Sequence, residues 1–158
     1  MKNLLFIYFL LLIVLSACTS SQWPPEPSQV HLGEDSCSEC RMIISDERYG
    51  AQLFDRGKPV DLFDDYGCLL SRRGVSDSSE RVVYVRSLED ASWIREDQAF
   101  YVVSKQISSP MGYGIAAFAA NESAARFAQG VDDSEIYSFS GLVSVAEKIV
   151  HAGFQRKE

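Results

Sequence analysis

The sequence predicts an α+β fold built from two tandem ββαβ units and a C-terminal helix. Segments typical of strands and helices follow one another as strand, strand, helix, strand, and this order occurs twice between residues 51 and 139. A final stretch with helical periodicity follows the second unit. Apolar residues make up 46% of the 158 residues, which is enough to form a core. Strands that are interrupted by single helices in this way are expected to pair mostly antiparallel.

The first unit is predicted between residues 51 and 86. Its elements are strands at 51–54 and 59–63, a helix at 65–73 and a strand at 81–86. Gly57 supplies the positive φ that a tight hairpin turn needs between the first two strands. Asp64 is predicted to cap the helix and Gly74 to end it.

The second unit is predicted between residues 99 and 139. Its elements are strands at 99–103, 115–118 and 135–139, with a helix before the last strand. Asn121 is predicted to cap that helix and Gly130 to end it. The final helix is expected to start at Ser140, because apolar residues then recur along one stripe: Leu142, Val145, Ala146 and Ile149.

The N-terminus has the features of an export signal. Lys2 precedes an apolar run from Leu4 to Leu15, and this run of about 12 residues is too short to span a bilayer comfortably. The run ends at Leu15-Ser16-Ala17-Cys18, which looks like a bacterial lipobox. We therefore expect residues 1–17 to be a lipoprotein signal peptide and Cys18 to carry the lipid, such as palmitate. A generic signal peptide with an incidental cysteine is the alternative.

Residues 18–36 are predicted to be the lipidated cysteine and a flexible tether, and residues 37–158 the folded domain. Three prolines between Trp23 and Pro27 disfavour a helix and favour extended chain. The expected location is the extracytoplasmic face of the cell envelope, such as the periplasm, with acyl chains as the membrane anchor. The inner and outer membranes are not distinguished by the sequence.

The charge of the chain excludes some functions. The formal net charge is −7, and removal of residues 1–17 would take away one lysine and no acid, which leaves −8. A domain this acidic is not expected to bind nucleic acid or to adhere to anionic lipid through basic patches.

Soft donor atoms are concentrated in Cys37-Ser38-Glu39-Cys40-Arg41-Met42. Two thiols on one turn can point to one ion, and the Met42 thioether follows closely enough to join them. Thiolate and thioether ligands favour Cu(I), whereas zinc and hard ions rarely use methionine. The spacing therefore predicts a Cu(I) site. Met111, the other methionine after Cys18, lies in a Gly- and Pro-rich loop, where it could be a further donor or fill a gap in the core.

Other functions of the cysteines remain open at this point. A disulfide between Cys37 and Cys40 is one alternative. A zinc site could add Cys68 and His31, although a buried inert thiol and a solvated histidine are the default interpretations of these two residues. A thiol oxidoreductase or lyase-like enzyme could use Cys37, Cys40 and Cys68. No Ser/His/Asp set or phosphate loop stands out, so we expect no enzyme.

Taken together, these residues resemble the NosL family, the copper-binding accessory lipoproteins of nitrous oxide reductase. The similar segments occur in one order along the chain: the lipobox, Cys40-Arg41-Met42, Tyr49-Gly50-Ala51-Gln52-Leu53, Lys58-Pro59, Phe63-Asp64-Asp65, Trp93-Ile94, Ala99-Phe100-Tyr101-Val102 and Pro110-Met111-Gly112. Two departures from the family are the additional Cys37, which creates a C-x-x-C pair, and Pro110 in the methionine loop.

The resemblance implies a Cu(I) metallochaperone that delivers copper to an envelope cuproenzyme, such as nitrous oxide reductase during its maturation. It implies two ββαβ units similar to those of organomercurial lyases. It also makes Cys40, Met42 and Met111 the best ligand positions. With Cys37 from the C-x-x-C pair, the expected metal set is Cys37, Cys40, Met42 and Met111.

Overall fold

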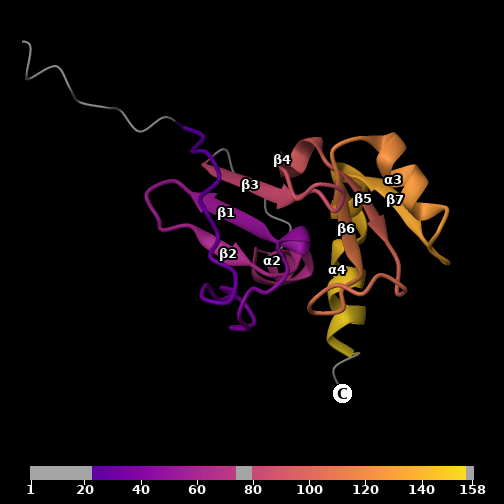
Figure 1. Ribbon diagram of the computed structural model, residues 1–158, viewed down its shortest axis with the longest axis horizontal. Coiled ribbons are helices and arrows are strands. Elements are labelled where there is room, and N and C mark those ends of the chain that lie inside the picture. Colours follow the sequence, from indigo (N-terminus) through magenta and orange to yellow (C-terminus); the bar gives the residue numbers. More distant parts are fainter. Residues whose placement is uncertain (1–22, 74–79, 156–158) are drawn as a thin grey trace, which may run out of the picture.

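Two antiparallel sheets lie side by side in the computed structural model, which describes residues 23–73 and 80–155 (Figure 1). The first half contains β1 (Ala51–Asp55), β2 (Asp61–Phe63), α2 (Tyr66–Arg73), β3 (Arg81–Arg86) and β4 (Trp93–Arg95). The second half contains β5 (Phe100–Val103), β6 (Ile115–Phe118), α3 (Asn121–Ala128), β7 (Glu135–Ser138) and α4 (Phe139–Gln155). Short 3-10 helices occupy Glu47–Tyr49 (η1) and Glu96–Gln98 (η2).

The predicted fold class, with two tandem ββαβ units and a C-terminal helix, is confirmed. The strand order is β2-β1-β3-β4 in the first sheet and β6-β5-β7 in the second, with every pairing antiparallel. The sequence did not predict β4, which adds a fourth strand beyond β3. Gly74 and most of the predicted loop at 75–80 lie outside the described residues.

Side-chain alternation along β5 and β6 places the second sheet between two cores. Helix α3 covers one face of this sheet, while α4 and α2 lie toward the other. Because successive strand residues point to opposite faces, neighbours in sequence enter different cores. The larger core takes Tyr101, Ile115 and Ala117, and the smaller core under α3 takes Val102, Ala116 and Phe118.

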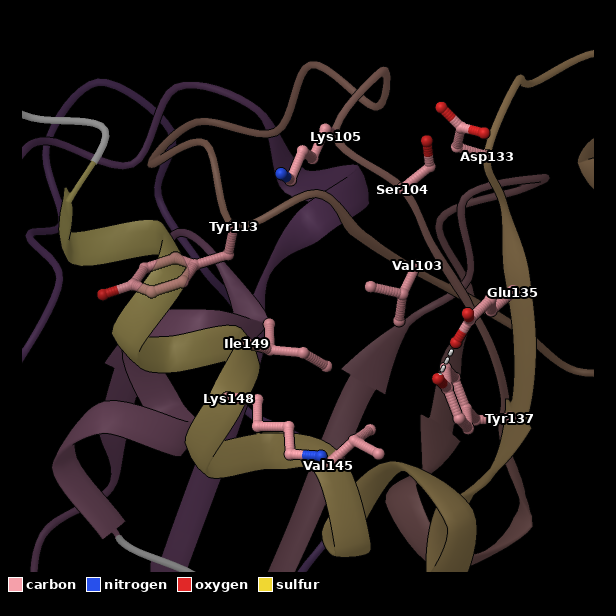
Figure 2. Close-up of a pocket in the computed structure, with 10 residues that line it drawn as sticks. All are labelled: Val103, Ser104, Lys105, Tyr113, Asp133, Glu135, Tyr137, Val145, Lys148 and Ile149. Atoms are coloured by element: carbon pink, nitrogen blue, oxygen red, sulfur yellow. Dashed lines mark hydrogen bonds between the residues drawn. The ribbon is translucent and has the colours of Figure 1, made fainter.

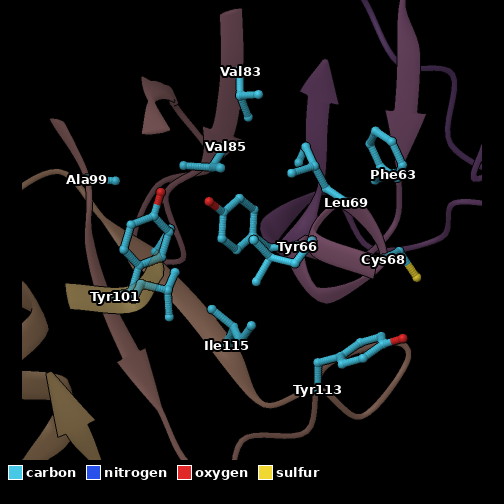
Figure 3. Packing of buried hydrophobic residues seen from close by; sticks show 14 of the residues in the cluster. Phe63, Tyr66, Cys68, Leu69, Val83, Val85, Ala99, Tyr101, Tyr113 and Ile115 are labelled. Atoms are coloured by element: carbon cyan, nitrogen blue, oxygen red, sulfur yellow. The ribbon is translucent and has the colours of Figure 1, made fainter. Parts of the chain in front are cut away.

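The larger core joins the two halves of the chain (Figure 3). Tyr66 at the start of α2 stacks on Tyr101 of β5 with ring centroids 5.1 Å apart, and its hydroxyl donates a hydrogen bond to Glu96. Leu69 and Cys68 from α2 are buried in the same core. Helix α2 is therefore held between the two halves, and it carries part of the candidate site.

The segment before the first sheet is attached to it. The Tyr84 hydroxyl donates to the carbonyl oxygen of Pro25 at 3.0 Å. The amide of Gln52 donates to the Ser28 carbonyl at 2.7 Å and accepts from the Ser28 backbone at 2.9 Å. Ordered contacts thus begin upstream of the predicted domain start at residue 37, within the segment predicted as a tether. No helix among the described residues is long and apolar enough to cross a membrane.

Candidate metal centre

Residues Cys37 to Met42 form a closed loop. The flanking residues Ser36 and Ile43 make an antiparallel bridge, and the Cys37 backbone donates to the Met42 carbonyl at 2.8 Å. Arg41 adopts a positive φ of 65°, which turns the chain back before Met42. The loop therefore returns on itself within six residues.

Hydrogen bonds fix this loop beside β2 and α2. The Ser38 backbone donates to the Leu62 carbonyl at 2.7 Å, and the Leu62 backbone donates to the Ser38 hydroxyl at 3.3 Å. The Arg72 guanidinium donates to the Ser38 carbonyl at 3.2 Å. The two predicted thiols are thereby held against the residues that begin helix α2.

Four potential ligands meet at this point. The sulfurs of Cys37, Cys40 and Cys68 and a carboxylate oxygen of Asp64 all lie within 4.8 Å of one another. Cys37, Asp64 and Cys68 have at most 2% of their surface exposed, whereas Cys40 is half-buried. All three cysteines are free thiols, so no disulfide joins Cys37 to Cys40 in this structure. Solvent can reach the cluster only on the side of Cys40.

The predicted helix cap at Asp64 is wrong by one residue. Asp65 precedes helix α2 and its carboxylate accepts from the Gly67 backbone at 2.9 Å, which is the N-cap interaction. Asp64 is thereby free for another partner, and its carboxylate accepts from the Cys40 thiol at 3.5 Å. The acid expected to cap the helix is thus a member of the cluster.

The electrostatics of the metal-free cluster favour one thiolate, Cys37, beside two protonated thiols, Cys40 and Cys68. A hydrogen bond from the Cys68 thiol lowers the pKa of Cys37 to about 4. The same hydrogen bond, with burial, raises the pKa of Cys68. Burial is the main cause that raises the pKa of Cys40 to about 11 and that of Asp64 to about 6. A metal ion that binds here has to displace the protons of Cys40 and Cys68.

The methionine loop reaches the same region through Asp65. The second oxygen of this carboxylate accepts from the Ser109 hydroxyl at 2.6 Å and from the Met111 backbone at 3.0 Å. Met111 is partly buried and packs against the larger core, as Cys40 does. Two adjacent acids therefore bring together the two predicted soft-donor segments.

The remaining predicted donors are not among the four clustered ligands. Met42 follows Cys40 by two residues in the same loop and is 58% exposed. His31 is mostly exposed and pairs with Asp35 at 3.4 Å, so it does not join the cysteine cluster. Cys18 lies outside the described residues.

The donor set fits a thiophilic ion. Thiolate sulfur is a preferred ligand of Cu(I) and Zn²⁺, and Ca²⁺ and Mg²⁺ require oxygen ligands instead. The carboxylate of Asp64 is a hard ligand that would suit zinc better than Cu(I). Sequence reasoning identified Cys37 and Cys40 but treated Cys68 as inert by default and used Asp64 as a cap. Only the fold places these two residues next to a loop that lies 24 residues before Asp64.

A cavity in the second half of the chain is lined by residues between Val103 and Ile149. Its volume is about 400 Å³. Figure 2 shows side chains from β5, β7 and α4 around it, among them Val103, Tyr137 and Ile149. None of the ten residues that line it carries sulfur. The cysteine cluster is thus the candidate metal centre among the described residues.

Comparison with known proteins identifies a family and a structural relative. The sequence profile of the NosL family matches residues 29–143. The crystal structure of the copper chaperone NosL from Shewanella denitrificans superposes with a TM-score of 0.62 at 21% sequence identity, and the match covers 74% of this chain and 96% of that one. At this identity the likeness supports the fold. No curated protein matches the sequence at a significant level.

Proposed function

The chain belongs to the NosL family, whose profile spans most of it, and from this premise we propose that it is a Cu(I)-binding chaperone. The observation that carries the proposal is the cysteine cluster, which solvent reaches through Cys40. Cu(I) is the cargo of this protein, and softness of the ligands selects it over the harder ions of the cell envelope. The structural relative from Shewanella denitrificans is a copper chaperone, which supports copper as the cargo.

Delivery by such a protein is ligand exchange. Cys40 and Met42 are the proposed exposed donors, Cys37 lies behind them, and Met111 approaches from the second half of the chain. An incoming partner ligand can replace one sulfur at a time, so that the ion is never released into solvent. The proposed acceptor is a copper-binding protein of the cell envelope or its maturation machinery, such as that of nitrous oxide reductase.

We infer that this role involves no catalytic turnover. Cys37 is the thiol with the lowered pKa, and it would be the nucleophile of a thiol enzyme. Its side chain has 0% exposed surface, so a substrate disulfide or carbon centre could not reach it without opening of the loop. Turnover of a dithiol substrate by the metal-free protein would contradict this inference.

We also propose that Cys18 carries the lipid and that the chain acts at the extracytoplasmic face of the envelope. The support is the order of charge, apolar run, small residues and cysteine at residues 2–18. Replacement of Cys18 by alanine is expected to abolish incorporation of labelled palmitate into the protein. Incorporation that persists in this variant would contradict lipid anchoring at this residue.

Copper binding is tested by Cu(I) titration of the reduced protein against a chromophoric chelator. Cys40→Ser should weaken binding more than about tenfold, because it removes a thiolate ligand. Met42→Ala should weaken it by a smaller factor, since a thioether is a weaker donor than a thiolate. Ile43→Ala is the matched control, because Ile43 is an exposed apolar neighbour on the same loop without sulfur. Wild-type affinity in both test variants would overturn the assignment.

A further inference from the structure

Cys68 is a buried thiol that the proposed transfer of copper through Cys40 and Met42 does not use. It lies in the first turn of α2, and its sulfur is within 4.8 Å of those of Cys37 and Cys40. A cysteine that merely filled the core could sit anywhere along the buried face of the helix. This one lies where two other sulfurs and a carboxylate converge.

The sulfur donors differ sharply in exposure. Cys37 and Cys68 are 0% and 1% exposed, whereas Met42 is 58% exposed. Cys40 is half-buried and belongs to the same loop as Met42. Cys40 is therefore the one described cysteine that can face both the buried thiols and the surface.

We propose that the site has two positions for Cu(I) that share Cys40. In the inner position the ion is held by the thiolates of Cys37, Cys40 and Cys68, and in the outer position by Cys40 and Met42. This inference rests on the proposed copper-binding function and adds Cys68 to the ligand set. It assigns storage to the inner position and transfer to the outer one.

The chemistry of each position follows from its donors. On entry, the ion displaces the thiol protons to solvent, and copper stays monovalent throughout. On exit, the bonds to Cys37 and Cys68 break as the bond to Met42 forms, and the Cys68 thiolate regains a proton from solvent while Cys37 stays the thiolate of the metal-free cluster. The ion is left two-coordinate and open to a partner's ligand. Cu(I) suits this exchange because soft sulfur ligands retain it in preference to oxygen.

Asp64 acts here as a positioning residue. Its carboxylate oxygens lie 3.5 and 3.6 Å from the Cys40 sulfur, and its side chain is buried. Among the described side chains no ion pair includes Asp64, so no cation other than a bound metal compensates it there. By accepting the hydrogen bond from Cys40, it holds the Cys40 sulfur within 4.8 Å of those of Cys37 and Cys68 in the metal-free protein.

The decisive measurement is the number of sulfur atoms around copper, determined by X-ray absorption on the reduced, Cu(I)-loaded full chain in detergent. The wild type should show three sulfur neighbours and no oxygen. Cys68→Ser keeps the size of the side chain but supplies a hard oxygen, so it should show one sulfur fewer and transfer copper faster to a chelator. Met42→Ala should keep three sulfur neighbours and transfer copper more slowly.

If Cys68→Ser does not fold, a double variant, Met42→Ala with Met111→Ala, tests the inner position instead, because it removes both methionine sulfurs. Three sulfur neighbours in this double variant must come from cysteines, and a fall to two would overturn the inner position. Unchanged coordination and transfer in Cys68→Ser would also overturn it, while the proposed copper function would stand. A wild type that binds Zn²⁺ through all four ligands but takes up no Cu(I) would instead overturn the proposed function.

Discussion

Asp64 and Asp65 are adjacent in sequence but their carboxylates serve different parts of the molecule. Asp64 accepts from the Cys40 thiol, while Asp65 caps α2 and accepts from Ser109 and Met111. Because Asp65 satisfies the helix start, Asp64 is available to the cysteine cluster. A shift of one residue in the cap would exchange these roles, so the spacing between the cap and Cys68 determines the geometry of the site.

Reactivity of Cys40 offers a test of the metal-free cluster. Only the thiolate reacts with iodoacetamide, and burial raises the pKa of Cys40 to about 11. Alkylation of Cys40 should therefore speed up roughly tenfold for each pH unit between pH 7 and 10, as the thiolate fraction grows. Peptide mass spectrometry after timed labelling measures this rate.

Cys37 and Cys68 provide the internal control for that experiment. The pKa of Cys37 is lowered by the Cys68 hydrogen bond, yet both side chains are buried and should be labelled only after unfolding. Labelling of Cys37 before Cys40 in the folded protein, or a flat pH profile for Cys40, would contradict the arrangement of the cluster.

Only part of the cysteine cluster can be predicted from the sequence. The short spacing of Cys37 and Cys40 predicts that they meet, because the two residues between them allow the chain to turn and bring both sulfurs together. Asp64 and Cys68 could not be assigned in this way, since their proximity depends on the pairing of the loop with β2 and on the exact start of α2. Cap assignments from sequence are accurate only to one or two residues, and that margin separates Asp64 from Asp65.

At the level of elements, helix α2 approaches the methionine loop without room for a side chain at Gly67. A Cβ built there would lie 2.0 Å from the Cγ of Tyr113, which follows Met111 in the loop. The backbone of α2 at Gly67 therefore packs directly against the aromatic ring of Tyr113. This contact holds Cys68, the next residue of α2, near the second half of the chain.

Gly67→Ala is expected to destabilise the protein although alanine favours helices by about 1 kcal/mol. Overpacking costs about 1–3 kcal/mol, and the rigid Tyr113 ring has to move to relieve it. Thermal unfolding should show a lower melting temperature. Gly141→Ala in α4 is the matched control, because its nearest atom would be 3.3 Å away and a much smaller change is expected. A stabilised Gly67→Ala protein would refute the close packing.

Elements with strong periodicity were predicted well and short or irregular ones were not. The apolar runs Val82–Val85 and Phe100–Val103 predicted strands at the observed places. Strand β2 starts at Asp61, two residues later than predicted from Pro59, which has no N–H to donate. Strand β4 has only three residues and pairs with the end of β3, so its pattern was too short to recognise. Asn121 begins α3 without a side-chain cap, contrary to the prediction.

On the scale of the whole molecule, the two ββαβ units share one core and should unfold together. Tyr66 stacks on Tyr101 across the halves, and the Leu88 backbone donates to the Ala117 carbonyl at 2.8 Å. Helix α4 closes the arrangement by contacting both α2 and the second sheet. Because neither half buries its apolar face alone, a single cooperative transition is expected in denaturant.

The carboxylate of Asp65 is a buried polar link between these halves, and replacing this residue tests how far the link couples them. It is buried and accepts from Gly67 in its own half and from Ser109 and Met111 in the other. Asp65→Ala leaves these donors without their partner, at a cost of about 1–3 kcal/mol for each donor that stays buried. We therefore expect a loss of about 3–5 kcal/mol in the free energy of unfolding, measured in urea.

Ser109→Ala removes one of the donors and should cost about 1–2 kcal/mol. Since the two side chains share a hydrogen bond of 2.6 Å, the double variant should lose less than the sum of the two single losses. Strict additivity would mean that Asp65 and Ser109 do not interact in solution.

Two separate transitions in the Asp65→Ala protein would still support the link, because they would show that the halves unfold independently once this carboxylate is gone. A single transition with wild-type stability would show that the apolar core alone joins them, and that the methionine loop is not held to the cysteine cluster by this acid.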